Sequence, residues 1–182
     1  MINYETERLI LRNYRSTDVQ DYFAYMSLES TAEHEDFDPF TLEQCEKAVS
    51  ERLKDDSYWV AEQKVSGIMI GDLSFSKNDF DTYEIAYDFN EAYHGNGYAT
   101  EAAKKLLEHI FRVLDGRRII AGCNEGNTAS RRLMERLGMR QEAFCIDDIS
   151  FKKDDEGNPI YISSYYYALL KREWLNKEKC DN

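Results

Sequence analysis

The segment that decides the fold runs from Tyr83 to Ala102 and reads YEIAYDFNEAYHGNGYATEA. Its first seven residues alternate as a half-buried strand does, which places Glu84, Ala86 and Asp88 on one face. A helix follows whose apolar residues recur on one stripe at helical spacing: Ala99, Ala103, Leu106, Leu107, Ile110, Phe111 and Leu114. The segment therefore predicts a strand, a glycine-containing loop and a long helix.

The loop holds two glycines one residue apart, Gly95 and Gly97. Glycine lets the backbone come close to a ligand because no Cβ stands in the way. The first N–H groups of a helix have no partner within it, and together with loop N–H groups they attract an anion such as pyrophosphate. No Lys-Ser or Lys-Thr follows, as a Walker loop requires, and Thr100 replaces the third glycine of a dinucleotide fingerprint. A nucleotide-binding protein is therefore nearly excluded.

On either side of this segment the chain alternates between strand-like and helix-like stretches. Before it come a strand at Arg8–Tyr14, helices opened by the capping boxes Thr17–Gln20 and Thr41–Gln44, and the strand-like pieces YWVAEQ and GIMIGDLSF. After it come the strand RRIIAGC, the helix NTASRRLMERLG and the strands RQEAFCI and YISSYYYALL, with the turn-rich KKDDEGNP between the last two. The pattern predicts one mixed α/β domain over residues 1–182, a central sheet with helices on both faces.

The charge is negative and unevenly spread. The chain carries −12 overall, which argues against nucleic acid as a partner because phosphate binding needs a positive surface. Between Ala92 and Arg140, nine Lys and Arg against five Asp and Glu give +4, so the remainder carries −16. This split predicts an anionic ligand in one place and a cationic one in another, or it is ordinary solubility charge.

No stretch has the length of a membrane span or the apolar core of a signal peptide, so we expect a cytoplasmic protein. The cysteines Cys45, Cys123, Cys145 and Cys180 are scattered, which predicts free thiols rather than a zinc site or a disulfide framework. The acidic turn EHED at Glu33–Asp36 is expected to be solvated, and no metal is expected.

Taken together, the strand, HGNGYATEA, the long helix, the next strand and NEGNTASRRLMERLGM resemble the GNAT superfamily of acyl-CoA N-acyltransferases. The chain looks most like the ribosomal-protein N-terminal acetyltransferase (RimJ/RimL-like) branch, whose opening is similar to TERLILRNYRSTDVQDYF and whose ending is similar to YYYALLKREW. The resemblance covers nearly the whole chain. It implies a twisted, mostly antiparallel sheet of about seven strands, acetyl-CoA as co-substrate and a primary amine as acceptor.

The resemblance also assigns a binding site for the co-substrate. The family's pyrophosphate loop, with His94 where relatives carry Gln or Arg, corresponds here to His94, Gly95, Asn96, Gly97, Tyr98, Ala99 and the following Thr100. Asn127 matches the asparagine that bonds the pantetheine arm, although it would serve equally well as the N-cap of the next helix. His94 can still donate a hydrogen bond to the phosphates, but at neutral pH it is not reliably charged. The pyrophosphate is therefore either bound more weakly or held with the help of Lys104, Lys105, Arg131 or Arg132.

Amide formation from a thioester needs a neutral amine, a donor for the carbonyl oxygen and a proton for the leaving thiolate. Many relatives use a tyrosine as the acid, but Met134 stands at that position here. The branch's serine corresponds to Ser130, which is the expected acid or else a helix-start serine that binds its own backbone. Glu84 matches a glutamate of the branch and is the expected base, or else a plain exposed carboxylate. The backbone N–H near Phe89 is the expected carbonyl donor.

Three functions stay open on the sequence alone. The main hypothesis is direct attack in a ternary complex by a primary amine, with a protein N-terminus as the branch-level acceptor. The rival acceptor is a small polycation, an aminoglycoside or a polyamine, and the acid-rich remainder of the chain favours a cationic acceptor of either kind. A non-catalytic acyl-CoA-binding domain is the third, because of Met134 and His94. The resemblance also leaves a homodimer open, since homodimers are common among relatives; YISSYYY is then its interface, or else a core strand.

Overall fold

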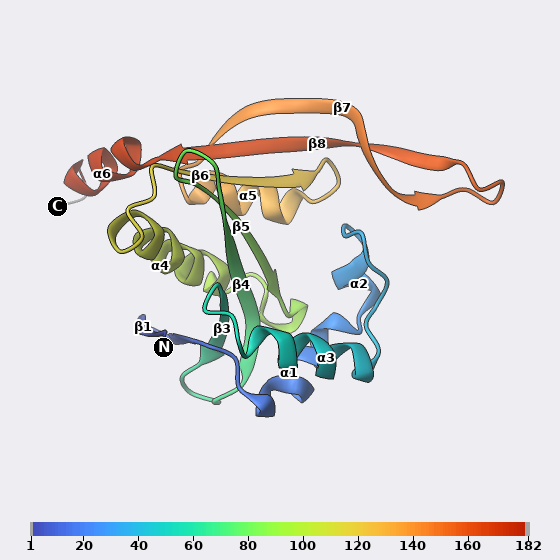
Figure 1. Ribbon diagram of the computed structural model, residues 1–182, viewed down its shortest axis with the longest axis horizontal. Helices are drawn as coiled ribbons and strands as arrows, with labels where there is room; N and C mark the ends of the chain where they lie inside the picture. Colours follow the sequence, from blue (N-terminus) through green and yellow to red (C-terminus); the bar gives the residue numbers. More distant parts are fainter. Residues whose placement is uncertain (1, 181–182) are drawn as a thin grey trace. The chain divides into compact units, whose positions relative to one another are not determined.

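Eight strands with intervening helices make up the computed structural model, which describes residues 2–180 and side chains up to residue 177 (Figure 1). The strands are β1 (Asn3–Glu5), β2 (Leu9–Arg12), β3 (Tyr58–Gln63), β4 (Met69–Asn78), β5 (Thr82–Phe89), β6 (Arg118–Asn124), β7 (Arg140–Lys153) and β8 (Pro159–Leu170). The helices are α1 (Val19–Met26), α2 (Glu29–Ala32), α3 (Leu42–Arg52), α4 (Tyr98–Arg112), α5 (Thr128–Arg136) and α6 (Lys171–Cys180), with 3-10 turns at Ser16–Asp18 and Glu91–Tyr93. The strand order is β1-β2-β3-β4-β5-β6-β8-β7.

The chain groups into two compact units. The first unit comprises the described residues up to Phe75 together with Ala86–Leu106, and the second comprises Ser76–Ile85 and the described chain from Leu107 on. Strands β4 and β5 and helix α4 contribute residues to both. The first unit contains nineteen acidic and nine basic side chains, so it carries −10 of the chain's net charge of −12.

The strands of the first unit form an antiparallel ladder. Leu9 and Leu11 of β2 pair with β3 and are fully buried, as their alternation predicts. A glycine marks the place where β4 meets the end of β5: a Cβ at Gly71 would lie 2.5 Å from the carbonyl oxygen of Asp88 and 2.6 Å from the Phe89 ring. Only glycine permits so close an approach, and this contact sets the position of the end of β5.

Helices α1 and α3 pack on each other over the core of the first unit. Helix α3 begins at the expected capping box: Gln44 N donates to Thr41 Oγ1 at 3.3 Å, and Thr41 N donates to Gln44 Oε1 at 2.7 Å. The core between the helices is rich in phenol rings, and its buried members are Tyr14, Tyr22, Tyr25, Met26, Cys45, Val49, Val60 and Met69.

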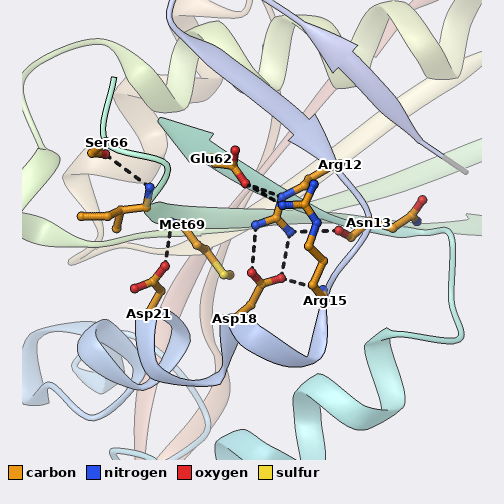
Figure 2. A network of polar contacts seen from close by, with 9 residues as sticks. Arg12, Asn13, Arg15, Asp18, Asp21, Glu62, Ser66 and Met69 are labelled. Carbon is orange, nitrogen blue, oxygen red and sulfur yellow. Dashed lines mark hydrogen bonds and ion pairs between the residues drawn. The ribbon is translucent and has the colours of Figure 1, made fainter. Parts of the chain in front are cut away.

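A buried ion-pair network fixes the start of α1 (Figure 2). Arg12 is 5% exposed; its Nη1 and Nη2 each donate to Asp18 at 2.8 Å, and its Nε donates to Glu62 at 2.6 Å. Asp18 also accepts from the backbone N–H of Arg15 at 2.6 Å. Burial lowers the pKa of Arg12, but the hydrogen bonds to the two carboxylates outweigh it and raise the pKa. The helix starts after Asp18, and the capping box predicted at Thr17 is wrong.

In the second unit β6 pairs in parallel with β5 and antiparallel with β8. Helix α5 lies against β6. Strands β7 and β8 run as a long two-stranded ribbon in Figure 1, and the pairing along it shifts register three times. Helix α4 ends at Arg112, and the chain then turns at Asp115, whose φ is 54°.

The fold class expected from the sequence is confirmed: a mixed α/β chain with a mostly antiparallel sheet. The strand count is eight rather than about seven, because Asn3–Glu5 adds β1, and α2 and α6 were not predicted. Within the described residues, no helix is long and apolar enough to cross a membrane. Cys45, Cys123 and Cys145 are free thiols, and the side chain of Cys180 lies outside those described.

Candidate functional site

The glycine loop lies in the first unit, between β5 and α4. Gly95 and Gly97 have φ values of +77° and +81°, a region that residues with a side chain disfavour. A Cβ at Gly95 would meet nothing within 4 Å, so the backbone conformation and not crowding calls for glycine there. None of the N–H groups from Gly95 to Ala99 donates a hydrogen bond to another described residue. Unpaired amides at the start of a helix suit a pyrophosphate.

Arg8 braces this loop from β2's side of the first unit. Its Nη1 donates to the carbonyl oxygen of Asn96 at 2.8 Å, its Nε donates to Glu101 Oε2 at 2.7 Å, and its guanidinium carbon lies 4.5 Å from the centre of the Tyr98 ring. Glu101 also accepts from Thr6 Oγ1 at 2.6 Å. Burial raises the pKa of Glu101, but the bonds from Thr6 and Arg8 outweigh it and lower the pKa. The first turn of α4 is therefore held by residues that precede it by about ninety positions.

The polar side chains of the loop support its own backbone. His94 Nε2 donates to the carbonyl oxygen of Phe89 at 2.8 Å. Asn96 Nδ2 donates to the carbonyl oxygens of Tyr93 at 3.2 Å and His94 at 3.1 Å. The donors left over for a ligand are the backbone N–H groups, and the His94 ring instead ties the loop to the end of β5.

Asn127 and Ser130 meet at the start of α5, in the second unit. Asn127 Oδ1 accepts from the backbone N–H of Ser130 at 2.9 Å, so Asn127 is the N-cap of the helix. Its own N–H donates to Asn124 Oδ1 at 3.1 Å. The two hydrogens on Asn127 Nδ2 donate to no described residue. Capping therefore uses the oxygen of this side chain and leaves its amide nitrogen as a donor.

Arg131 and Met134 follow on α5. The guanidinium carbon of Arg131 lies 5.2 Å from the centre of the Tyr165 ring, and its buried Nε makes no hydrogen bond to the residues described. The nearest carboxylate oxygen to this Nε belongs to Glu135, at 4.0 Å. Met134 is fully buried in the core, as a side chain without a chemical role would be.

Glu84 lies on β5 in the second unit. The burial of β5 follows the expected alternation, with Tyr83 and Ile85 buried and Glu84 exposed. The Glu84 carboxylate has one weak contact, Asn78 Nδ2 at 3.5 Å from its Oε2. Phe89, at the end of the same strand, belongs to the first unit and is half-buried.

A polar cluster that the sequence did not reveal lies inside the aromatic core of the first unit. Asp72 is 4% exposed and accepts from Tyr25 Oη at 2.6 Å and from Arg52 Nη1 at 2.9 Å. The same Arg52 nitrogen donates to Tyr14 Oη at 2.8 Å. The guanidinium carbon of Arg52 lies 4.8 Å from the centre of the Tyr22 ring. Burial raises the pKa of each of the three phenols well above its ordinary value.

Asp88 and Glu35 add two carboxylates to this cluster. The pKa of Asp88 is raised to about 7: burial contributes most, the charges of Asp72 and then Glu35 add to it, and the charge of Arg52 opposes them. Burial likewise raises the pKa of Glu35 to about 7, with help from Asp36. Neither Asp88 nor Glu35 makes a hydrogen bond or ion pair to the described side chains, whereas Arg52 is paired with Asp72. Two carboxylates of the cluster therefore have no paired cation among the described residues.

The residues expected from the sequence thus fall into two groups. The first unit brings together Phe89 and the loop from His94 to Thr100, and the second brings together Asn127, Ser130 and Arg131, with Glu84 on its own strand. Only a local signal for the missed cluster was present: Asp72 lies within the apolar stretch MIGDL of β4, and Asp88 lies between Tyr87 and Phe89 of β5. Among the described residues no group of three or more His, Cys, Asp or Glu could hold a metal ion.

Comparison with known proteins gives the family of the chain. The family model described as an acetyltransferase (GNAT) domain matches residues 8–140. The Bacillus subtilis (strain 168) protein named uncharacterized N-acetyltransferase YnaD is 33% identical over 171 residues, which cover 93% of this chain and 97% of that protein.

Solved structures show the same fold. A crystal structure of a GNAT-family acetyltransferase from Bacillus anthracis superposes with a TM-score of 0.85 at 31% identity, covering 94% of this chain and 99% of that one. A chimera of the spermidine N-acetyltransferase SpeG, from Vibrio cholerae and hSSAT, has a TM-score of 0.75 at 17% identity, covering 93% and 99%. At that identity the second likeness shows the fold alone.

Proposed function

We propose, because this chain belongs to the acetyltransferase (GNAT) family and is an N-acetyltransferase, that it moves the acetyl group of acetyl-CoA to a positively charged primary amine. Acetyl-CoA is the co-substrate of the family. The observation that carries the proposal for this chain is the glycine loop, where backbone N–H groups from Gly95 to Ala99 have no partner among the described residues. An anionic group would satisfy them.

We assign the pyrophosphate of CoA to this loop and the pantetheine arm to Asn127. Support for the second assignment is that capping uses only Asn127 Oδ1, so the Nδ2 hydrogens can donate to an amide carbonyl of the arm. Arg131 would supply positive charge for the phosphates, and its buried Nε without a hydrogen bond among the described residues is consistent with a missing partner. Ser130 remains the proposed donor to the leaving thiolate, and the N–H near Phe89 remains the proposed carbonyl donor. Glu84, the base expected from the sequence, is one of two candidates for that role, and the other is argued below.

The positive charge of the acceptor is proposed from the charge distribution. The first unit, which holds the glycine loop, carries −10, and a field of that sign concentrates cations at the surface. A protein N-terminus, as in the RimJ/RimL-like branch, and a polyamine both present such an amine. The SpeG chimera is named as a spermidine N-acetyltransferase, which makes spermidine a suitable first probe. The homodimer and the cytoplasmic location expected from the sequence stay predictions.

Two measurements test the proposal. Titration calorimetry with CoA and with acetyl-CoA should give saturable heat, and thiol release from acetyl-CoA should follow on adding spermidine, kanamycin or a peptide with a free N-terminus. The same peptide with an acetylated N-terminus is the control and should release no thiol. Saturable binding without thiol release for any amine would favour a non-catalytic acyl-CoA-binding domain, and absence of CoA binding by the folded protein would remove the proposal.

A further inference from the structure

The carboxylates of the first unit are not equivalent. Both carboxylate oxygens of Asp72 accept a hydrogen bond, one from Tyr25 Oη and the other from Arg52 Nη1. Asp88 is half-buried and has no such donor among the described residues. A carboxylate removed from water without a partner is unfavourable when charged, and such an arrangement recurs where a cation or a proton is to be received.

Tyr22 supplies an independent sign that a ligand is missing. Its side chain is fully buried, and its hydroxyl makes no hydrogen bond to any described residue. The guanidinium carbon of Arg52 lies 4.8 Å from the centre of its ring. Burial, then the charge of Asp72 and to a smaller degree that of Asp88, raise the pKa of the hydroxyl. A buried hydroxyl without a partner is uncommon because its hydrogen-bonding capacity is lost on folding. The Tyr22 oxygen could accept a hydrogen bond from an incoming N–H group in the same unit as Asp88.

The position of Asp88 also ties it to the co-substrate loop within the same unit. Asp88 directly precedes Phe89, whose carbonyl oxygen accepts from His94 at 2.8 Å. The close contact at Gly71 fixes the backbone of Asp88 and Phe89. The strand end that carries Asp88 is therefore anchored to the first residue of the loop that we assign to the pyrophosphate.

We propose that the Asp88 carboxylate binds the ammonium group of the acceptor and takes one of its protons, with the Tyr22 hydroxyl oxygen as a second acceptor. The inference rests on the proposed function and names the base of that reaction. It differs from the expectation for Glu84, which lies exposed on β5. At the exposed Glu84 an ammonium group would gain little by leaving water, because water weakens its attraction to the carboxylate. At the half-buried Asp88 the attraction between carboxylate and ammonium is stronger, and no other cation is paired with Asp88 among the described residues.

The proton balance of the step is as follows. The acceptor R–NH₃⁺ gives one proton to Asp88, and the lone pair of R–NH₂ then forms the N–C bond with the acetyl carbonyl carbon. The tetrahedral intermediate breaks its C–S bond, the sulfur leaves with the bonding pair, and the second nitrogen proton passes to it. The products are the acetamide, CoA thiol and a proton on Asp88, which is later released to water.

The charged groups around Asp88 set the pH at which it works. Asp72 on β4 and Glu35 after α2 raise its proton affinity, Arg52 on α3 lowers it, and Tyr22 on α1 stays neutral. Burial and the two carboxylates outweigh the effect of Arg52, so the pKa of Asp88 is raised to about 7. A base works only when deprotonated, so kcat/KM should rise as the pH rises through about 7. Carbon-13 NMR of protein labelled at the aspartate carboxyl carbons should show one resonance titrating there, absent from Asp88→Asn.

The test compares Asp88→Asn with two other carboxylate variants in the thiol-release assay with spermidine and with a free-N-terminus peptide. Asp88→Asn should lower kcat/KM at least about 100-fold and abolish the rising limb near pH 7, while the Kd for CoA stays within about twofold. Glu46→Gln removes an exposed carboxylate on α3 and should leave kcat/KM unchanged. Glu84→Gln tests the rival base.

The outcomes separate cleanly. If Asp88→Asn keeps wild-type kcat/KM while Glu84→Gln loses it, Glu84 is the base and the inference is overturned. If the wild type itself releases no thiol with any amine, the proposed function fails, and the inference falls with it. Asp88→Asn should also unfold at an equal or higher temperature than the wild type above pH 7, because the raised pKa means that the charged form is unfavourable in the folded state. A lower unfolding temperature would mean that lost activity reflects damage to the fold.

Discussion

Gly95 is the residue at which an added Cβ atom would test the proposed CoA site most directly. Its φ of +77° disfavours any side chain, yet a Cβ there would meet no atom within 4 Å. Gly67 is its match in the same unit, with φ of +69° and equally open space. The two glycines therefore share a backbone requirement. Gly67 N donates to the Gln63 carbonyl oxygen at 2.8 Å, whereas the N–H of Gly95, in the proposed pyrophosphate loop, has no partner among the described residues.

Gly95→Ala and Gly67→Ala should each destabilise the fold by about 1–2 kcal/mol, because alanine in the left-handed region costs about that much. Only Gly95→Ala should also weaken CoA binding, since its Cβ would stand where the phosphates approach. Thermal unfolding and titration calorimetry measure the two effects on the same samples. Equal CoA affinity in both variants would place the pyrophosphate elsewhere.

At this scale the sequence predicted the glycines from their spacing but not the role of His94. A histidine at the first loop position suggested a donor to the phosphates. The structure turns its Nε2 to the Phe89 carbonyl instead. The sequence assigned Asp88 to the Glu84 face of its strand without a role, because alternation says which side a residue takes and not how many cations surround it there.

Among the elements, α5 shows how one side chain can serve two purposes. The Asn127 oxygen caps the helix, and its nitrogen stays available. Asn127→Asp should keep the cap, because a carboxylate oxygen can accept from Ser130 N, but it removes the donor. We expect an unfolding temperature near the wild type's and weaker CoA binding.

Asn127→Ala is the matched change, since it removes both functions and should also cost about 1 kcal/mol of stability. If Asn127→Asp bound CoA as the wild type does, the side chain would be a cap only. The two possibilities left open by the sequence, cap and ligand, are thus separable by experiment.

The start of α1 depends on the Arg12 network in Figure 2. Arg12→Ala would leave Asp18 and Glu62 with no cation from Arg12 in a buried setting, and the loss should be about 3–5 kcal/mol. Lys77→Ala is the control: it breaks the exposed Lys77–Asp81 pair and should cost less than about 1 kcal/mol. Urea unfolding of both variants measures the difference, and similar midpoints would contradict a structural role for the buried network.

The boundaries of the helices show that a local sequence pattern does not always predict where an element begins. Thr41 and Gln44 form the capping box that their spacing predicts. The same pattern at Thr17 and Gln20 does not, because Asp18 pairs with Arg12, six residues earlier, and α1 starts after it. Three-residue and four-residue elements such as β1 and α2 carry too few periods for any pattern to register.

For the whole molecule, charge is the property that the sequence predicted only in part. The −12 and its uneven spread were visible, but the segments that gather into the −10 unit are separated along the chain. The mixed α/β class followed from the order of elements. The polar cluster around Asp72 could not, because it joins α1, α3, β4 and β5 through contacts that no short stretch contains.

This charge predicts a salt dependence. If a polycation is drawn to the first unit, the KM for spermidine should rise several-fold between about 20 and 300 mM NaCl, since the screening length falls below about 10 Å above 0.1 M. A monoamine of similar length is the control and should show a smaller rise. Initial rates of thiol release at saturating acetyl-CoA measure both. A KM for spermidine that is insensitive to salt would remove the electrostatic argument for a cationic acceptor.

The bracing of the glycine loop by Thr6 and Arg8 has a practical consequence for anyone handling this protein. Thr6 and Arg8, near the amino end of the chain, hold the loop and the first turn of α4 in place through hydrogen bonds to Glu101 and to the Asn96 carbonyl oxygen. Removing Thr6 or Arg8, or placing a fused tag against them, would remove or disturb contacts that hold the loop, although the loop lies about ninety residues further along the chain. Expression designs should spare that end, and screening libraries should treat positions 6 and 8 as neighbours of 96 and 101.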